Sequence, residues 1–242
     1  MKSITNRQDE ILMAIIREFM DSADEIGSIS LLEKYDLGVS SATIRNEMAH
    51  LMDLGLLEKS HVSSGRHPTD QALRMYVSKV IGGSRLNPVI AIQIRQGIFR
   101  ERFSKDSIVK SILRLLAEKG EGVAFLVFDD EIRYYGLANL FKYEELCNMQ
   151  SLERVVQLLE DDNFMMQMFS QFNNSGVALL IGEETGVKGL SECSIVFTRI
   201  KLPQTEKGYV GILSSKRMDY KKVVPALKEI QEATKESLKG WY

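Results

Sequence analysis

Apolar residues near the start of the chain recur at the three- and four-residue spacing of amphipathic helices. Thr5 and Gln8 have the spacing of a capping box, which predicts that a first helix begins there. A second, shorter helix is expected to begin at Ser28 or Ser30 and to end near Tyr35. The apolar positions of the first helix are Ile11, Leu12, Ile15, Ile16 and Phe19.

The segment 40–59 predicts a third helix whose two faces differ in chemistry. Ile44, Met48 and Leu51 recur at i, i+4 and i+7, which predicts one buried stripe. Ser40 or Ser41 can cap the first turn. The opposite face has short side chains that permit close approach, and donors that can reach phosphates and base edges. Its members are Ser41, Thr43, Arg45, Asn46, Ala49 and His50.

A hairpin is predicted directly after this helix. Gly55 stops the helix, residues 56–57 begin an extended segment, and the turn at 63–65 returns the chain toward Arg66. Helix, helix, turn, helix and hairpin is the order of a winged helix-turn-helix, which reads the major groove. We therefore predict a DNA-binding domain at residues 1–81. The expected contacts are Ser40, Ser41, Thr43, Arg45, Asn46, His50, Lys59, Ser63, Ser64, Arg66 and His67.

Two simpler interpretations compete with DNA binding. A short amphipathic helix that ends in glycine is usually only a packed helix, and it is the neighbouring helices and hairpin that favour a DNA reader here. A winged helix can also serve protein contacts alone. Such a wing is expected to expose apolar side chains, whereas this one carries Ser63, Ser64, Arg66 and His67.

Charge gives this domain an unusual balance. Residues 1–81 contain 9 Lys and Arg against 12 Asp and Glu, a net of 9 − 12 = −3, and the whole chain has a net charge of −2. Basic DNA-binding domains have the opposite sign. Residues 59–69 contain no carboxylate, so the predicted contact surface is locally positive. Its positive or titratable residues are Lys59, His61, Arg66 and His67.

The pattern changes after residues 82–88, where Gly-Gly-Ser and Asn-Pro predict a linker. Helical periods are expected around 108–116, 152–159 and 220–230. Strands mixed with helices predict an α+β domain at 89–242, so the fold class is a winged helix-turn-helix followed by a mixed α/β domain. The short β-branched or aromatic runs that predict strands are 89–94, 123–128, 132–137, 177–181, 195–200 and 209–213.

Composition fits a globular chain of two domains, with 242 residues, 44% of them hydrophobic and 26% charged. Cys147 and Cys193 have apolar neighbours and no C-x-x-C spacing, which predicts reduced core thiols and a cytoplasmic location. The N-terminus lacks a signal-peptide pattern, and no window approaches eighteen apolar residues. We therefore expect no membrane span.

The second domain is not expected to catalyse a reaction. All three histidines, His50, His61 and His67, fall in the first domain, so the second has no imidazole for proton transfer. Glycine-rich nucleotide-binding motifs are missing from the sequence, and acidic runs such as 129–131 have the flanks of solvated turns. We expect no catalytic residue, no cofactor and no metal.

The residues around Asp219 suggest an alternative role for the second domain, as a ligand sensor. Asp219 is placed to cap a helix that starts at Tyr220, and the turn before it could present N–H groups to a small anion. The simpler interpretation, which we favour, is that Asp219 caps, Arg217 pairs with a carboxylate and Met218 packs. The basic residues nearby are Lys216, Arg217, Lys221 and Lys222.

Two blocks of sequence resemble one known family. The first joins GVSSATIRNEMAHLMDLGLLEK to SSGRHPTD, and the second contains, in order, YYGLANL, GVALLIGEE, SECSIVFTRI, GYVGIL and KRMDYKKV. They resemble the heat-inducible transcription repressor family HrcA over roughly residues 5–80 and 132–238. The resemblance implies a GAF-like second domain and repression of chaperone genes. It also implies a homodimer on an inverted-repeat operator in double-stranded DNA, with the chaperonin as modulator.

The chain departs from the family pattern at three places. The family has a dimerising domain inserted into the GAF-like domain, and residues 82–131 are too short to hold it. Ile29 stands where the family tends to have a basic residue, and Ser214 and Ser215 replace an expected Gly-Pro. Without the insert, the pairing surface should come from the rest of the chain. The candidate, which could equally be core, is Phe164, Met165, Met168, Phe169 and Phe172.

Overall fold

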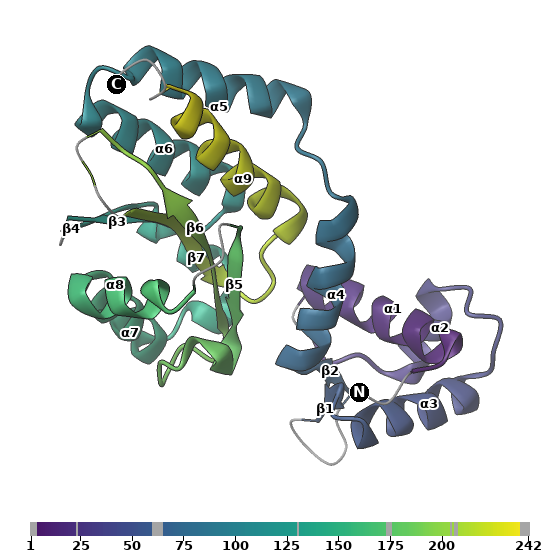
Figure 1. The fold of residues 1–242 in the computed structure, drawn as a ribbon. Helices are drawn as coiled ribbons and strands as arrows, with labels where there is room; N and C mark the ends of the chain where they lie inside the picture. The colour runs from purple at the N-terminus through teal and green to yellow at the C-terminus, as the bar shows by residue number, and fades with distance from the viewer. Residues whose placement is uncertain are drawn as a thin grey trace. The chain divides into compact units, whose positions relative to one another are not determined.

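The computed structural model describes residues 4–22, 24–59, 65–129, 131–172, 176–203, 205 and 208–237 (Figure 1). The chain divides into two compact units, Met1–Lys79 and Val80–Tyr242. Each unit has its own core and is described by itself.

The first unit has the element order predicted for a winged helix. Its two short strands pair antiparallel, with Leu57 opposite Pro68 and Glu58 opposite His67. The capping box is confirmed, because the Thr5 N–H donates to Gln8 Oε1 at 3.0 Å. The elements are α1 (Asn6–Ser22), α2 (Ser28–Lys34), α3 (Ser41–Asp53), β1 (Leu57–Glu58), β2 (His67–Pro68) and α4 (Asp70–Gly83), which runs on into the second unit.

The predicted apolar stripes form the core of the first unit. The five apolar positions predicted on α1 are buried, and Leu31 of α2 and Ile44, Met48 and Leu51 of α3 are buried with them. Gln8 Nε2 also donates to Glu47 Oε2 at 2.9 Å, which joins the start of α1 to the middle of α3. The orientation of α3 is therefore fixed both by its apolar face and by a polar contact.

The described strands of the second unit form one antiparallel sheet in the order β4-β3-β7-β6-β5. The predicted strands at 123–128, 132–137, 177–181, 195–200 and 209–213 are confirmed to within a few residues, and the fold class is mixed α/β as expected. The strands are β3 (Val123–Phe128), β4 (Glu131–Tyr135), β5 (Ala178–Ile181), β6 (Cys193–Ile200) and β7 (Gly208–Ser215).

Helices cover both faces of this sheet (Figure 1). On one face α6 and α9 contact the strands, and α5 packs on these two helices as an outer layer. On the other face lie α7 and α8. The helices are α5 (Pro88–Glu101), α6 (Lys105–Gly120), α7 (Met149–Leu159), α8 (Asp162–Ser170) and α9 (Tyr220–Ser237), with 3-10 turns η1 (Leu137–Lys142), η2 (Glu144–Leu146) and η3 (Gly182–Thr185).

One predicted strand is wrong, because residues 89–94 begin helix α5. Asn87 caps this helix, with its side-chain oxygen accepting from the Val89 N–H at 2.9 Å, and Pro88 occupies the first turn. Ile94 and Ile98 are buried four residues apart. A short continuous apolar run does not by itself distinguish a strand from a helix.

The predicted pairing set is also wrong in its main members, because Met165, Met168 and Phe169 lie in the core. The Phe169 ring stacks on Phe125 with centroids 5.3 Å apart and lies 4.1 Å from the ring of Phe197. Phe172 packs against the same cluster, and only Phe164 is exposed. Helix α8 therefore covers an apolar face of the sheet with these side chains.

The two cysteines are free thiols in different environments. Cys193 is buried in β6, and burial raises the pKa of its thiol to about 12, so it stays protonated. Cys147 is exposed, which corrects the expectation that both are core residues. Within the described ranges, no helix has the length and apolar character needed to cross a membrane.

Candidate nucleic-acid interface

Helix α3 has defined ends. Ser40 is the N-cap, and its hydroxyl accepts from the Thr43 N–H at 3.2 Å and lies 3.0 Å from Thr43 Oγ1. At the other end Gly55 has φ +72°, and the Leu56 N–H donates to the Leu51 carbonyl at 2.9 Å. This closes the helix as a Schellman motif, because glycine takes the left-handed conformation without strain.

The face of α3 opposite its buried stripe is exposed along the whole helix. Arg45 and Asn46 lie at the centre of this face, and neither makes a side-chain hydrogen bond or ion pair with another described residue. Thr43 and Ser41 are half-buried at its edge. The exposed members, spaced by three or four residues, are Ala42, Arg45, Asn46, Ala49, His50 and Asp53.

His50 extends this face by one turn toward the end of α3. Its Nδ1 lies 3.6 Å from Glu47 Oε2, and the imidazole is mostly exposed. The Glu47 carboxylate also accepts from Gln8. A protonated His50 would keep an acidic neighbour, so it adds less to the positive potential than the sequence suggested.

The hairpin, called the wing below, is anchored by a third extended segment. The Ile26 N–H donates to the Arg66 carbonyl at 2.9 Å, and the Arg66 N–H donates to the Ile26 carbonyl at 3.0 Å. Gly65 makes this approach possible, because a Cβ there would lie 2.8 Å from the Ile26 nitrogen and from the Glu25 carbonyl carbon. The base of the wing thus depends on a glycine and on a residue forty positions earlier.

Two side chains predicted to contact DNA are engaged at the base of the wing. Arg66 is half-buried, and its Nε donates to Met52 Sδ at 3.1 Å. His67 Nε2 lies 3.4 Å from Glu58 Oε1, and its Nδ1 lies 4.0 Å from Glu25 Oε1. The locally positive surface expected from the sequence is therefore partly neutralised. Glu58 comes from the facing strand of the hairpin, just outside the segment 59–69, and Glu25 comes from a distant part of the chain.

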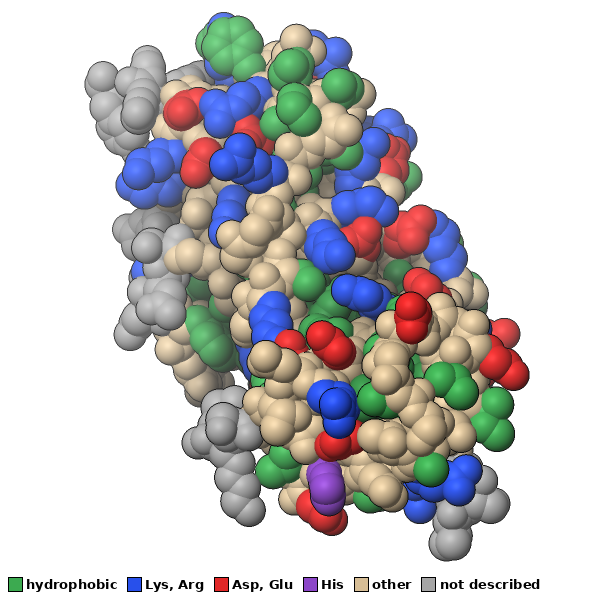
Figure 2. All heavy atoms as spheres, turned by 90° about the vertical axis from the view of Figure 1, so that its right-hand side faces the viewer, with side chains coloured by type: hydrophobic (Ala, Val, Ile, Leu, Met, Phe, Trp, Pro, Cys, Tyr) green, Lys and Arg blue, Asp and Glu red, His purple; other side chains and the backbone are tan. Residues whose placement is uncertain are grey.

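Lys59 is exposed at the end of β1, where the wing leaves its paired base. Ser63, Ser64 and His61 lie outside the described residues. Sequence reasoning missed the exposed apolar residues Ile29 and Leu32 on α2, which a helical plot of that short segment could have found. Figure 2 shows blue and red side chains intermixed over the face it presents, without a single basic field.

The basic cluster in the second unit is taken up by carboxylates. Arg217 donates to Glu145 through Nε at 2.9 Å and through Nη2 at 3.1 Å, and both side chains are largely buried. Burial alone would raise the pKa of the Glu145 carboxyl, but hydrogen bonds from Arg217 and Ser215 lower this pKa by more, so the net pKa lies below its ordinary value. Lys216 lies 3.4 Å from Glu192.

The structural interpretation of this cluster is confirmed at each residue. Asp219 Oδ1 accepts from the Lys221 N–H at 3.1 Å, as a helix cap does, and Met218 is fully buried. Lys222 lies 2.8 Å from Asp219. An anion here would have to displace a carboxylate from Arg217. Across the described ranges, no group of three His, Cys, Asp or Glu residues could hold a metal ion.

A helix-turn-helix with a short wing, joined to a GAF-like α+β domain, defines a two-domain protein of the winged-helix regulator class. A family model described as the HrcA protein C terminal domain matches residues 51–224, well over half of the chain. The chain therefore belongs to the HrcA family.

Similar proteins agree with this assignment over the full length. The chain is 24% identical to the heat-inducible transcription repressor HrcA of Clostridium perfringens (strain SM101 / Type A), with 98% of this chain and 99% of the relative covered. It is also 24% identical to the heat-inducible transcription repressor HrcA of Bacillus pumilus (strain SAFR-032), with 99% of each covered. A crystal structure of a hypothetical protein has the same fold, with a TM-score of 0.81, 18% identity, and 100% and 99% of the two chains covered.

The relatives have internal positions that this chain lacks. The alignment with the C. perfringens protein spans 339 positions, and this chain has 242 residues, so at least 339 − 242 = 97 positions have no counterpart here. Because nearly all of both chains is covered, the missing positions are internal. The interval from 88 to 128 is filled by α5, α6 and β3.

Proposed function

We propose that this protein is a transcription repressor that binds duplex DNA with the exposed face of α3 and with its wing. The observation that supports this most is the stripe centred on Arg45 and Asn46. The fold holds it outward on a helix whose opposite face is buried, and no described side chain occupies its donors. Arginine and asparagine are the side chains that pair with guanine and adenine edges in the major groove.

The genes and the operator that we propose for this repressor are inferred from the relatives, which are named heat-inducible transcription repressors. We propose that this chain represses chaperone genes in the cytoplasm by binding an inverted-repeat operator as a homodimer. One domain with a net charge near −3 binds too few phosphates to hold DNA tightly alone, so a second copy is required. The chaperonin is the proposed modulator of repressor activity.

The test uses a duplex from the chaperonin promoter of the source organism and a scrambled duplex of equal length. Fluorescence anisotropy titrations of the full chain should give tighter binding to the promoter, by at least about 1,000-fold for a specific site. Arg45→Ala should remove most of this preference. Equal affinity for the two duplexes would contradict the proposal.

A matched control separates base reading from a general loss of charge. Arg17 is exposed on α1, a different helix from the one that carries Arg45, so Arg17→Ala removes the same charge from the same unit. It should leave the preference for the promoter duplex unchanged. If both substitutions weaken binding to both duplexes equally, the α3 face contributes only charge.

A further inference from the structure

Helix α5 and the two residues that follow it expose a row of apolar side chains. Val89, Ile92, Phe99 and Phe103 are 63%, 53%, 57% and 70% exposed. With Gln96 they follow one another at intervals of three, four, three and four residues. This is the a/d spacing of a helix that pairs with another helix. These five residues are called the α5 seam below.

The seam is exposed because α5 is an outer helix. It buries Ile94 and Ile98, which lie on the side of the helix that packs on α6 and α9. At 100° per residue the four seam positions within α5 fall within an arc of about 80° on the outward side, and Phe103 follows in the turn after the helix. The seam is thus continuous, and its second half, Gln96, Phe99 and Phe103, adjoins α9 across a groove.

The exposed area is larger than ordinary surface scatter. Side chains of this size expose on the order of 400–500 Å² at these fractions, in the range of the largest apolar patches on monomers. Two such faces pressed together would bury roughly 1,000 Å², the area at which a specific interface begins. A second copy of the same face satisfies this requirement.

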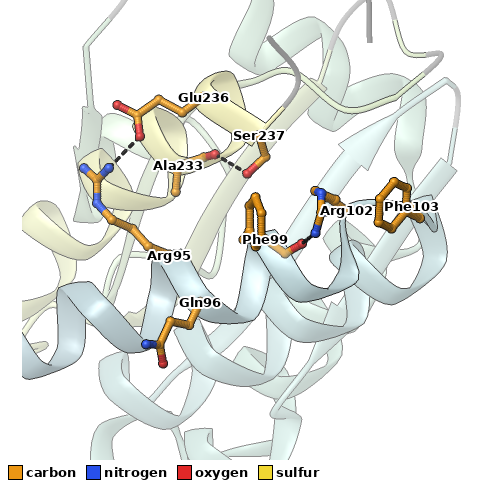
Figure 3. Close-up of a pocket in the computed structure, with 8 residues that line it drawn as sticks. All are labelled: Arg95, Gln96, Phe99, Arg102, Phe103, Ala233, Glu236 and Ser237. Atoms are coloured by element: carbon orange, nitrogen blue, oxygen red, sulfur yellow. Dashed lines mark hydrogen bonds and ion pairs between the residues drawn. The ribbon is translucent and has the colours of Figure 1, made fainter. Parts of the chain in front are cut away.

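A groove beside the seam carries charges of both signs. It has a volume of about 850 Å³ and lies between α5 and the last turns of α9, with the Phe99 ring projecting into it (Figure 3). The Arg102 guanidinium lies 3.8 Å from the centroid of Phe99 and 4.1 Å from that of Phe103. On the α9 side Glu236 pairs with Arg95 at 2.6 Å.

These charges make the face self-complementary. Arg100 is highly exposed on α5, and Glu232 and Glu236 are exposed on α9. A two-fold axis through the seam can therefore set the arginines of one copy against the glutamates of the other. A patch that carries both partners of its own ion pairs fits an isologous contact.

We propose that two copies of this chain pair through the α5 seam, with Gln96 near the two-fold axis. The pairing uses residues of this chain alone, which lacks at least 97 internal positions of the longer C. perfringens relative. It rests on the proposed function only in its consequence for DNA. Residues 84–87 join α4 to α5, so pairing the two α5 helices tethers two DNA-binding units to one axis.

The first test measures mass in solution without DNA. The wild-type chain should be a dimer by light scattering at micromolar concentration. The double variant Ile92→Lys, Phe99→Lys should be a monomer, with the dimer dissociation constant raised by roughly 100-fold or more, because charge enters the centre of the contact. Phe141→Lys is the matched control, since Phe141 is equally exposed but lies in η1, and it should remain a dimer.

A second test reports proximity and does not depend on a folded double variant. In a Cys147→Ser background, Gln96→Cys should form a disulfide-linked dimer under mild oxidation, because position 96 near the two-fold axis faces itself whether the two α5 helices pair parallel or antiparallel. Gln157→Cys, exposed on α7, is the control and should not. Efficient linkage by Gln96→Cys supports the pairing.

The outcomes separate this inference from the proposed function. A wild-type chain that is a monomer at tens of micromolar contradicts the proposed pairing. An Ile92→Lys, Phe99→Lys variant that stays dimeric contradicts it as well. So does equal linkage by Gln96→Cys and Gln157→Cys. If the dimer depends on the seam but shows no preference for the promoter duplex, the pairing is supported and the proposed repressor function is contradicted.

Discussion

At the scale of single residues, burial decides which polar groups are available to a partner. Asn46 and Arg45 are exposed and lack partners among the described side chains, whereas Arg66 and His67 are engaged at the base of the wing. The first pair is suited to reading bases, and the second to holding the wing in place. The sequence alone gave all four the same role.

Asn46→Ala tests base reading. The substitution should cost about 1–3 kcal/mol of binding free energy on the preferred operator and much less on random DNA, because a lost bidentate contact matters only where the right base is present. Anisotropy titrations on both duplexes measure this. An equal loss on both would show that Asn46 does not specify sequence.

Lys59→Ala tests the exposed end of the wing. A lysine that neutralises one phosphate releases counterions, so its removal should reduce the slope of log affinity against log salt by roughly one unit on any sequence. Lys142→Ala, at an exposed lysine of η1, is the control and should leave the slope unchanged. A slope that Lys59→Ala does not alter would take this residue out of the interface.

At the scale of elements, contacts between distant segments fix the wing and the sheet. The wing is held by the pairing of Ile26 with Arg66. The turn after β7 is held by the contact between Arg217 and Glu145, which are 72 residues apart. In each case one close contact sets the position of a whole element. Each therefore offers a substitution with a defined effect.

Gly65→Ala should disturb the base of the wing. The new Cβ would lie 2.8 Å from backbone atoms of Glu25 and Ile26, so the bridge to Arg66 has to open. We expect a stability loss of about 1–3 kcal/mol in the first unit, as for other overpacked sites, and weaker DNA binding. Thermal unfolding followed by circular dichroism, with Gly82→Ala at an uncrowded glycine as control, measures the loss.

Glu145→Gln should change the dependence of stability on pH. The pKa of Glu145 is lower in the folded chain than its ordinary value, so its contribution is present above the unfolded pKa near 4.5 and is lost as pH falls through the folded pKa. The variant should be less stable at neutral pH, by about 3 kcal/mol for a broken buried pair, and should lose less on acidification. Urea titrations at pH 7 and pH 4 compare the two.

At the scale of the whole molecule, the proposed pairing would be coupled to DNA binding through the short connection between α4 and α5. Each copy carries one α3, and an inverted repeat presents two half-sites about one DNA turn apart. Two recognition helices on one paired body bind the second half-site at high effective concentration. Affinity for a full operator should therefore exceed affinity for a half-site by far more than the twofold increase in the number of half-sites.

Ile92→Lys, Phe99→Lys should expose this coupling. Neither residue lies in the first unit, so binding to an isolated half-site should match that of the wild type. Binding to the full operator should fall by at least about 100-fold, the lower range of avidity gains. Titrations on half-site and full-site duplexes measure both values, and a variant that keeps full-site affinity would break the link between the seam and operator binding.

Features that depend on neighbours along the chain could be predicted from the sequence. The capping box at Thr5 and Gln8, a cap at Ser40 or Ser41, the stop at Gly55 and most strands were predicted, because hydrogen bonds within a turn and side-chain periodicity involve residues a few positions apart. The family motifs are equally local. They identified the family without any knowledge of packing.

Which apolar surfaces are covered could not be predicted from the sequence, because it depends on how the elements pack. The run at 89–94 and the phenylalanines and methionines of α8 are similar in hydrophobicity, yet α8 packs on the sheet and α5 keeps its seam exposed. The tertiary structure also places Glu25 beside His67 and Glu145 beside Arg217. Burial and charge pairing depend on contacts between residues that are distant along the chain. The local pattern of hydrophobic and polar residues does not specify those contacts.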